Sequence, residues 1–138
     1  MKNELSIVEN EKRRMYCSMD MNDVENKKKF LNGTENADYR LSDCLNNVIE
    51  IVDVYIEENV KTETDEKTGE VKEYPKYRTI IWDKNGNTYA TGSYGIFNIL
   101  QKIFFVYGEP NTWNTPLKVK VTKKNVNDKQ MFTLEVIE

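Results

Sequence analysis

The residues around an Asn-Gly pair are well suited to contacting flat, charged molecules. The segment WDKNGNTYATGS begins at Trp82. Asn-Gly is a strong signal for a β-hairpin, because both residues tolerate the positive φ of a type I′ turn. With Asn85 and Gly86 as the two turn residues, Trp82 lies opposite Tyr89, and Arg78 projects from the same face. This pattern predicts a hairpin face with one guanidinium group and two aromatic rings.

Such a face is typical of surfaces that bind single-stranded nucleic acid. Bases of any identity stack on aromatic rings, and each stacked base contributes about 1–3 kcal/mol. The alternative is that Trp82 and Tyr89 form a cross-strand pair in the core. Because burial of an unpaired guanidinium is costly, Arg78 on the same face favours exposure.

Further candidates lie on other predicted strands. Tyr55 faces outward if Val54 and Ile56 are core residues, which makes it a second candidate for stacking, with core packing as the alternative. Residues 111–138 hold five lysines and three acids, so this end is locally basic. Lysines near phosphates add binding that depends on salt and not on sequence. The candidate phosphate contacts are Lys118, Lys120, Lys123 and Lys124. For isolated lysines the alternative is a solvated strand face.

The composition narrows the class of protein. The chain has 138 residues, a net charge of −3, 2 cysteines and 0 histidines. Cys17 and Cys44 are expected to be free thiols, since they form no CxxC pair. Histidine is the commonest general base and a frequent zinc ligand. We therefore expect no enzyme activity, no metal and no cofactor.

The absence of long apolar segments predicts where the protein is located in the cell. No run of about 18 apolar residues is present, so we expect no membrane partner. Residues 1–14 lack the apolar stretch of a secretory signal. These features predict a cytoplasmic protein.

The predicted elements follow one another in an order typical of a known barrel. Strands are expected over 47–60, 76–82, 87–91, 116–124 and 131–137, and a helix is expected from its N-cap Ser93 to Tyr107. Five strands with a helix between the third and fourth is the order of an OB-fold barrel. The alternative is an open α+β sheet with the helix on one face. The long first strand favours the barrel, because a bent strand can serve two of its sides.

We therefore expect an all-β fold with one helix, a five-stranded OB-type barrel. Residues 13–138 form one domain, with an N-terminal extension over 13–46 and the barrel over 47–137, and residues 1–12 are expected to be flexible. The extension is predicted to hold a short strand over 14–20 and a short helix. Asn22 or Asp23 caps that helix and Gly33 ends it. The charged segment 61–75 is expected to be an exposed loop or ribbon.

The chain also resembles small single-stranded DNA-binding proteins of bacteriophages that infect Gram-positive bacteria. The shared pattern is an aromatic residue (Trp82), a turn with glycine, Tyr89, then Ser93 and a helix. It covers residues 47–137 and implies an OB fold that coats displaced strands cooperatively during DNA replication. Tyr55 and Tyr89 match the places of that family's candidate stacking tyrosines. The first 46 residues have no clear counterpart in its smallest members, and we expect no disordered acidic tail.

The partner implied by this resemblance is single-stranded DNA. RNA, further copies of the chain and replication proteins are additional candidates. A rival hypothesis is a small phage or plasmid module that inhibits or recruits a host protein, with the acids of residues 50–73 mimicking nucleic acid. The net charge of −3 supports that rival. A nuclease is a third hypothesis, but it needs converging metal-binding carboxylates, and the acids lie scattered along the predicted strands.

Overall fold

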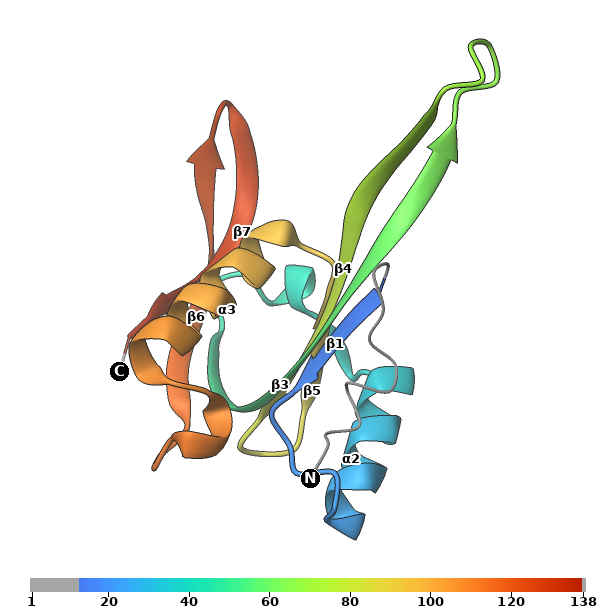
Figure 1. The fold of residues 1–138 in the computed structure, drawn as a ribbon. Helices are drawn as coiled ribbons and strands as arrows, with labels where there is room; N and C mark the ends of the chain where they lie inside the picture. Colours follow the sequence, from blue (N-terminus) through green and yellow to red (C-terminus); the bar gives the residue numbers. More distant parts are fainter. Residues whose placement is uncertain (1–12, 138) are drawn as a thin grey trace.

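One strongly curled β-sheet organises the molecule. The computed structural model describes residues 13–137, so the segment 1–12 that we expected to be flexible lies outside the described residues. The strands are β1 (Arg13–Cys17), β2 (Tyr39–Arg40), β3 (Val48–Thr64), β4 (Val71–Asp83), β5 (Thr88–Thr91), β6 (Leu117–Val126) and β7 (Lys129–Val136). The helices are α2 (Val24–Glu35) and α3 (Tyr94–Tyr107), with short 3-10 turns η1 (Leu41–Cys44) and η2 (Pro110–Thr112) (Figure 1).

Strand β3 is the centre of this sheet. The strand order is β2-β5-β4-β3-β6-β7, and β1 also pairs with β3. The first part of β3, from Val48 to Ile51, pairs with β6, and the part from Ile51 to Thr64 pairs with β4. A register shift between Ile51 and Asp53 marks a bulge, which bends the strand between its two partners. One long strand therefore serves two sides of the curled sheet.

The architecture is a half-barrel that is broadly OB-like, and it differs from the expected fold in its details. Among the described residues there are seven strands and two helices, where we expected five strands and one helix. The expected helix is present as α3. The hydroxyl of Ser93 accepts a hydrogen bond from the N–H of Ile96 at 3.3 Å, and Gly108 ends the helix with φ +83°. The additional elements β1, α2 and β2 come from the N-terminal residues before β3. β1 and α2 correspond to the short strand and short helix expected in the N-terminal extension, and β2 was not expected.

The main core lies between α3 and the inner face of the sheet. α3 contributes Ile96, Leu100 and Ile103, which lie on one side of the helix. The strands contribute alternating aliphatic residues: Ile49, Ile51, Val54, Ile56, Ile81, Leu117, Val119, Val121 and Leu134. Before the bulge in β3, the odd-numbered residues Ile49 and Ile51 face this core. After the bulge, the even-numbered residues Val54 and Ile56 face the core.

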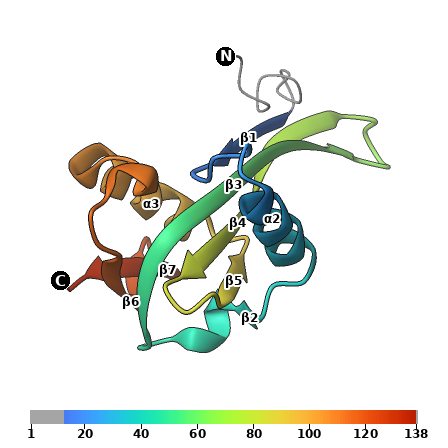
Figure 2. The same ribbon diagram turned by 90° about the horizontal axis from the view of Figure 1, so that it is seen from below.

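A second core lies on the opposite face of the sheet. There β1 and α2 cover β3 and β4, so the two helices lie on opposite sides of these strands (Figure 2). Its buried members are Met19, Tyr55, Ile80 and Trp82, with Met15, Cys17, Met21, Phe30, Ala37, Val52 and Ala90 packed against them. The face that we expected to be open for a ligand is therefore largely covered by the N-terminal segment.

Polar contacts tie this cover to the sheet. The hydroxyl of Ser18 donates to Asp53 at 2.8 Å and accepts from the N–H of Val54 at 2.9 Å. The ammonium group of Lys29, on α2, lies 3.1 Å from the same Asp53 carboxylate. Asp53 thereby links the segment after β1, the helix α2 and the strand β3.

The ends of α2 were partly predicted from the sequence. Asp23 is the N-cap, and its carboxylate accepts from the N–H of Glu25 at 2.8 Å. Gly33 does not end the helix, because α2 continues to Glu35. Instead, Gly33 is buried where the helix meets the sheet, and its missing side chain leaves space for the indole ring of Trp82.

The hairpin between β4 and β5 has a register one residue away from the one we expected. Trp82 pairs with Thr88 and Ile81 pairs with Tyr89, so Tyr89 lies on the opposite face from Trp82. The carboxylate of Asp83 accepts from the N–H groups of Asn85 and Asn87, both at 2.9 Å, which favours a longer turn. Since side chains alternate along a strand, a shift of one residue exchanges the faces.

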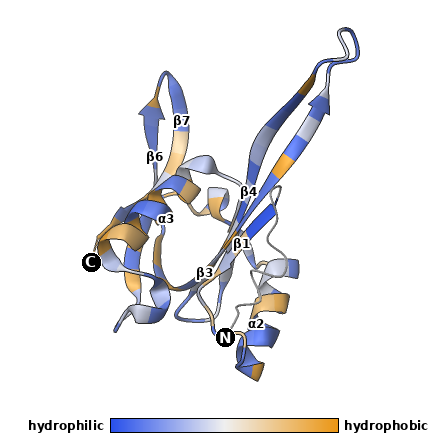
Figure 3. Cartoon of the chain, in the orientation of Figure 1, coloured by the Kyte–Doolittle hydropathy of each residue, from blue (hydrophilic) through white to orange (hydrophobic). Residues whose placement is uncertain are grey.

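Two hairpins project from the body of the molecule. One is formed by the distal parts of β3 and β4, and the other by β6 and β7 (Figure 1). The β6–β7 turn is tight, since Asn127 and Asp128 both have positive φ as a two-residue type I′ turn requires. The projecting part of the β3–β4 hairpin is mostly hydrophilic (Figure 3), which confirms that residues 61–75 form an exposed ribbon.

Candidate nucleic-acid interface

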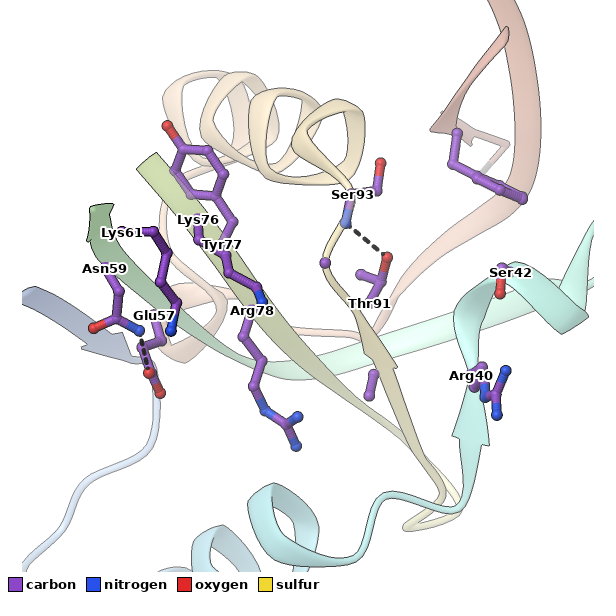
Figure 4. Close-up of a pocket in the computed structure, with 13 residues that line it drawn as sticks. Arg40, Ser42, Glu57, Asn59, Lys61, Lys76, Tyr77, Arg78, Thr91 and Ser93 are labelled. Atoms are coloured by element: carbon purple, nitrogen blue, oxygen red, sulfur yellow. Dashed lines mark hydrogen bonds between the residues drawn. The ribbon is translucent and has the colours of Figure 1, made fainter. Parts of the chain in front are cut away.

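A surface groove of about 650 Å³ lies where the β3–β4 ribbon leaves the body of the molecule. Residues of β3 and β4 line one side, and Arg40 and Ser42 line the other, with Ser93 at the start of α3 between them (Figure 4). The remaining lining includes Phe132 from β7. The groove thus collects residues from five separate segments of the chain.

The groove is cationic although the whole chain is acidic. Four basic side chains and one carboxylate line it: Arg40, Lys61, Lys76, Arg78 and Glu57. Arg40, Lys61 and Lys76 are exposed, and none of the three forms an ion pair with another described residue. A concave surface with this charge concentrates anions near it.

The one carboxylate of the groove is held by neighbouring donors. Glu57 accepts hydrogen bonds from the Tyr55 hydroxyl at 2.7 Å and from the Asn59 amide at 2.6 Å. Although burial alone would raise the pKa of Glu57, these hydrogen bonds and the nearby guanidinium groups of Arg13 and Arg78 hold its pKa below the ordinary value. Its negative charge is therefore already compensated by the protein.

The helix α2 fixes one of the cations of the groove. Arg78 donates a hydrogen bond of 2.6 Å to the backbone carbonyl of Thr34, in the last turn of α2. The last carbonyl groups of a helix lack helical partners and carry partial negative charge, so they are suitable acceptors for a guanidinium group. Arg78 remains exposed while it makes this contact.

Aromatic side chains complete the lining. Tyr77 stacks on Phe97 of α3, with the ring centroids 4.2 Å apart and an interplanar angle of 25°. Phe132 lies beside Lys123, whose ammonium group is 5.1 Å from the ring centroid. At the start of α3, Gly95 lies against the backbone of Phe132 so closely that a Cβ atom would overlap its carbonyl oxygen. The backbone of Phe132 therefore lies directly against the start of α3.

Two of the predicted stacking residues lie in the second core. Trp82 is 1% exposed and Tyr55 is 2% exposed. The Tyr55 ring packs edge-on against Phe30 at 5.0 Å. Tyr55 does face away from Val54 and Ile56, as we expected, but β1 and α2 cover that face. The expectation that these rings are exposed was wrong, because it omitted the packing of the N-terminal extension.

Tyr89 occupies a different environment from the one we expected. It packs against the main core, stacks on Tyr39 at 5.4 Å and donates a hydrogen bond of 2.8 Å to Asp83. Burial, together with this hydrogen bond to a carboxylate, raises the pKa of the Tyr89 hydroxyl. Tyr89 does not line the groove, and its contacts are those of a residue that supports the hairpin.

The predicted lysines divide between the two faces of the β6–β7 hairpin. Lys123 lies on the same face as Phe132, its cross-strand partner. Lys118, Lys120 and Lys124 alternate with it and lie on the other face. Lys118 is opposite Glu50, and Lys120 is opposite Glu135. Of the eight predicted contacts, Arg78 lines the groove directly and Lys123 lies beside a lining residue.

Several residues of the groove were not predicted from the sequence, among them Arg40, Lys61, Lys76, Tyr77 and Phe132. Lys61 began the segment 61–75, which we expected to be an exposed loop or ribbon, and Lys76 began the predicted strand 76–82. Their pairing partners are Tyr74 and Asn59, which places both lysines on one face of the ribbon. In residues 72–78 the basic residues Lys72, Lys76 and Arg78 all fall on even positions, which was the available signal. No pattern in the sequence predicted that Arg40 lies in this groove.

A curled β-sheet with a cationic groove lined by aromatic rings defines an OB-like protein suited to binding nucleic acid. The chain belongs to the phage single-stranded DNA-binding protein family, whose family model matches residues 9–137. The matched range includes the N-terminal extension, which the resemblance over residues 47–137 had left out. No curated protein and no solved structure matches the chain. No helix among the described residues is long and apolar enough to cross a membrane.

Proposed function

We propose that this protein coats single-stranded DNA during phage or mobile-element replication, without sequence preference and without chemistry on the strand. The observation that carries the proposal is the cationic groove, since four basic groups around one compensated carboxylate favour a polyanion. Membership of a family of single-stranded DNA-binding proteins supports DNA as that polyanion. The activity belongs in the cytoplasm of the host cell, where displaced strands arise.

In this proposal the groove binds the backbone and the bases by different groups. Arg40, Lys61, Lys76 and Arg78 contact phosphates, and the ring of Phe132 contacts a base. The ring of Tyr77 lies on the opposite face of β4 from Arg78 and stacks on Phe97, so it supports the wall of the groove. Every base has a π-face and every nucleotide has a phosphate, so this division accepts any sequence. Self-association along the strand, contacts with replication proteins and binding of RNA are further parts of the hypothesis.

The decisive experiment is the salt dependence of binding to poly(dT). For single strands, the logarithm of the affinity falls against the logarithm of salt with a slope of about 0.7 for each phosphate contact. Lys61→Ala and Lys76→Ala should each reduce the slope by about that amount. Lys102→Ala is the matched control, because Lys102 is exposed on α3 and does not line the groove. Unchanged slopes for both groove variants would exclude the groove, and no binding to poly(dT) at low salt would exclude the function.

The same titration tests the predicted lysines of the β6–β7 hairpin. Lys123→Ala should reduce the slope, because Lys123 shares its face with Phe132. Lys118, Lys120 and Lys124 lie on the other face, so a reduced slope for these variants would mean that the strand also contacts the outside of this hairpin.

A further inference from the structure

The two faces of the projecting β3–β4 ribbon carry charges of opposite sign. The ribbon is a regular antiparallel ladder from Glu57–Arg78 to Thr64–Val71. In such a ladder, directly opposed residues share a face and successive residues alternate between faces. The register therefore assigns each side chain of the ribbon to one of two faces.

One face, which we call the basic face, consists of Glu57, Asn59, Lys61, Glu63, Lys72, Tyr74, Lys76 and Arg78. Two contacts confirm this assignment. The amide of Asn59 donates to Glu57 at 2.6 Å, and the hydroxyl of Tyr74 donates to Glu63 at 3.5 Å. Four cations thus share this face with two carboxylates, and Glu63 lies directly opposite Lys72.

The other face, the acidic face, consists of Glu58, Val60, Thr62, Thr64, Val71, Glu73, Pro75 and Tyr77. It contains two carboxylates and no basic side chain. A face with four cations and two carboxylates attracts a polyanion, whereas a face with two carboxylates and no cation repels one. Of the two faces, the basic face is therefore the one suited to contact a polyanion.

The basic face is continuous with the groove. Lys61, Lys76 and Arg78 belong to both, and the next residues outward on this face are Tyr74 and Lys72. Tyr74 is 45% exposed and lies directly opposite Lys61. Its neighbours on the same face of β4 are Lys72 and Lys76. The turn beyond them, residues 65–70, holds three acids and one lysine, so the cationic surface ends before the tip.

We propose that the basic face of the ribbon is a second segment of the DNA-binding path, with one base stacked on Tyr74. Lys61, Lys72 and Lys76 contact the phosphates on either side of that base. The inference rests on the proposed function of the groove and extends it by identifying the ribbon as the part that contacts longer strands. A strand too short to leave the groove does not reach Tyr74.

The test measures affinity for dT oligonucleotides of graded length, from about 4 to about 16 nucleotides, the range that one OB fold covers. Tyr74→Ala should leave the affinity for the shortest oligonucleotides unchanged. It should lower the affinity for the longest ones between about 5-fold and about 150-fold, the equivalent of one stacked base. Lys72→Ala should likewise reduce the salt slope only for the longer oligonucleotides.

Two variants control for changes in the ribbon itself. Tyr74→Phe keeps the ring and should keep the affinity at every length. Thr62→Ala changes the acidic face at a similar distance from the body and should have no effect. Equal affinity of Tyr74→Ala and the wild type at all lengths would overturn the proposal, as would an equal loss at all lengths. Because Arg40 lines the groove from β2 and is not part of the ribbon, Arg40→Ala tests the groove separately. A reduced salt slope for Arg40→Ala with no effect of Tyr74→Ala would refute the ribbon contact alone.

Discussion

Gly33 of α2 lies directly against the indole ring of Trp82, and a Cβ atom at residue 33 would be 2.6 Å from Cζ2 of that ring. Atoms of a real side chain do not approach so closely without displacement. This contact lets α2 pack onto the sheet and brings the carbonyl of Thr34 within 2.6 Å of Arg78. A packing contact in the second core and the position of a groove cation are therefore linked.

Substitution of Gly33 by alanine tests this packing. In an exposed helix, Gly→Ala stabilises by roughly 0.5–1 kcal/mol. Here overpacking against Trp82 should reverse the sign and cost about 1–3 kcal/mol. Urea unfolding followed by circular dichroism measures the difference. Asn32→Ala, at an exposed position of the same helix, should change stability little. A Gly33→Ala protein as stable as the wild type would show that α2 does not press against Trp82.

The burial of Trp82 predicts how fluorescence responds to DNA. In Trp113→Phe protein, Trp82 is the remaining tryptophan. Since Trp82 is 1% exposed under β1 and α2, its emission should stay unchanged on addition of poly(dT) at low salt. Binding itself is followed in parallel by the anisotropy of a labelled oligonucleotide. Salt-reversible quenching of Trp82 would mean that the N-terminal cover moves away when DNA binds.

The environment of Glu57 predicts a dependence of stability on pH. Its pKa is lowered in the folded protein, so the folded state favours the carboxylate. This contribution is fully present above the unfolded-state value of about 4.3 and is lost as the pH falls through the lower folded value. In Glu57→Gln protein, the free energy of unfolding should therefore decline less steeply below about pH 4.3 than in the wild type.

Tyr55→Phe supplies the matched comparison for this prediction. It removes one of the hydrogen bonds that hold the Glu57 carboxylate, so its acid-induced loss of stability should lie between those of the wild type and Glu57→Gln. Unfolding by urea at a series of pH values measures all three proteins. An identical decline in the wild type and Glu57→Gln would show that Glu57 is not stabilised as a carboxylate.

The strands after residue 46 were predictable because their signals are local. Alternation in β6 and β7, β-branched residues in β3 and the Ser93 cap of α3 each depend on a few adjacent residues. The N-terminal segment, where we predicted a short strand over 14–20, carried a comparable signal. Met15, Cys17, Met19 and Met21 alternate, and all four contribute to the second core. This pattern predicts a chain segment with one apolar face, but it does not say which surface that face covers.

By itself, the sequence determined the order of the main elements, the exposed ribbon and the OB-like class, because hydrophobic periodicity and capping act over short distances. Only the tertiary structure decided which face of the sheet is open. The carboxylate of Asp83 shifts the hairpin by one residue, which turns Tyr89 to the opposite face. The packing of β1 and α2 then buries Tyr55 and Trp82, and long-range pairing brings Arg40 and Phe132 to the groove. Apart from the shift within the hairpin turn, these outcomes depend on contacts between distant segments.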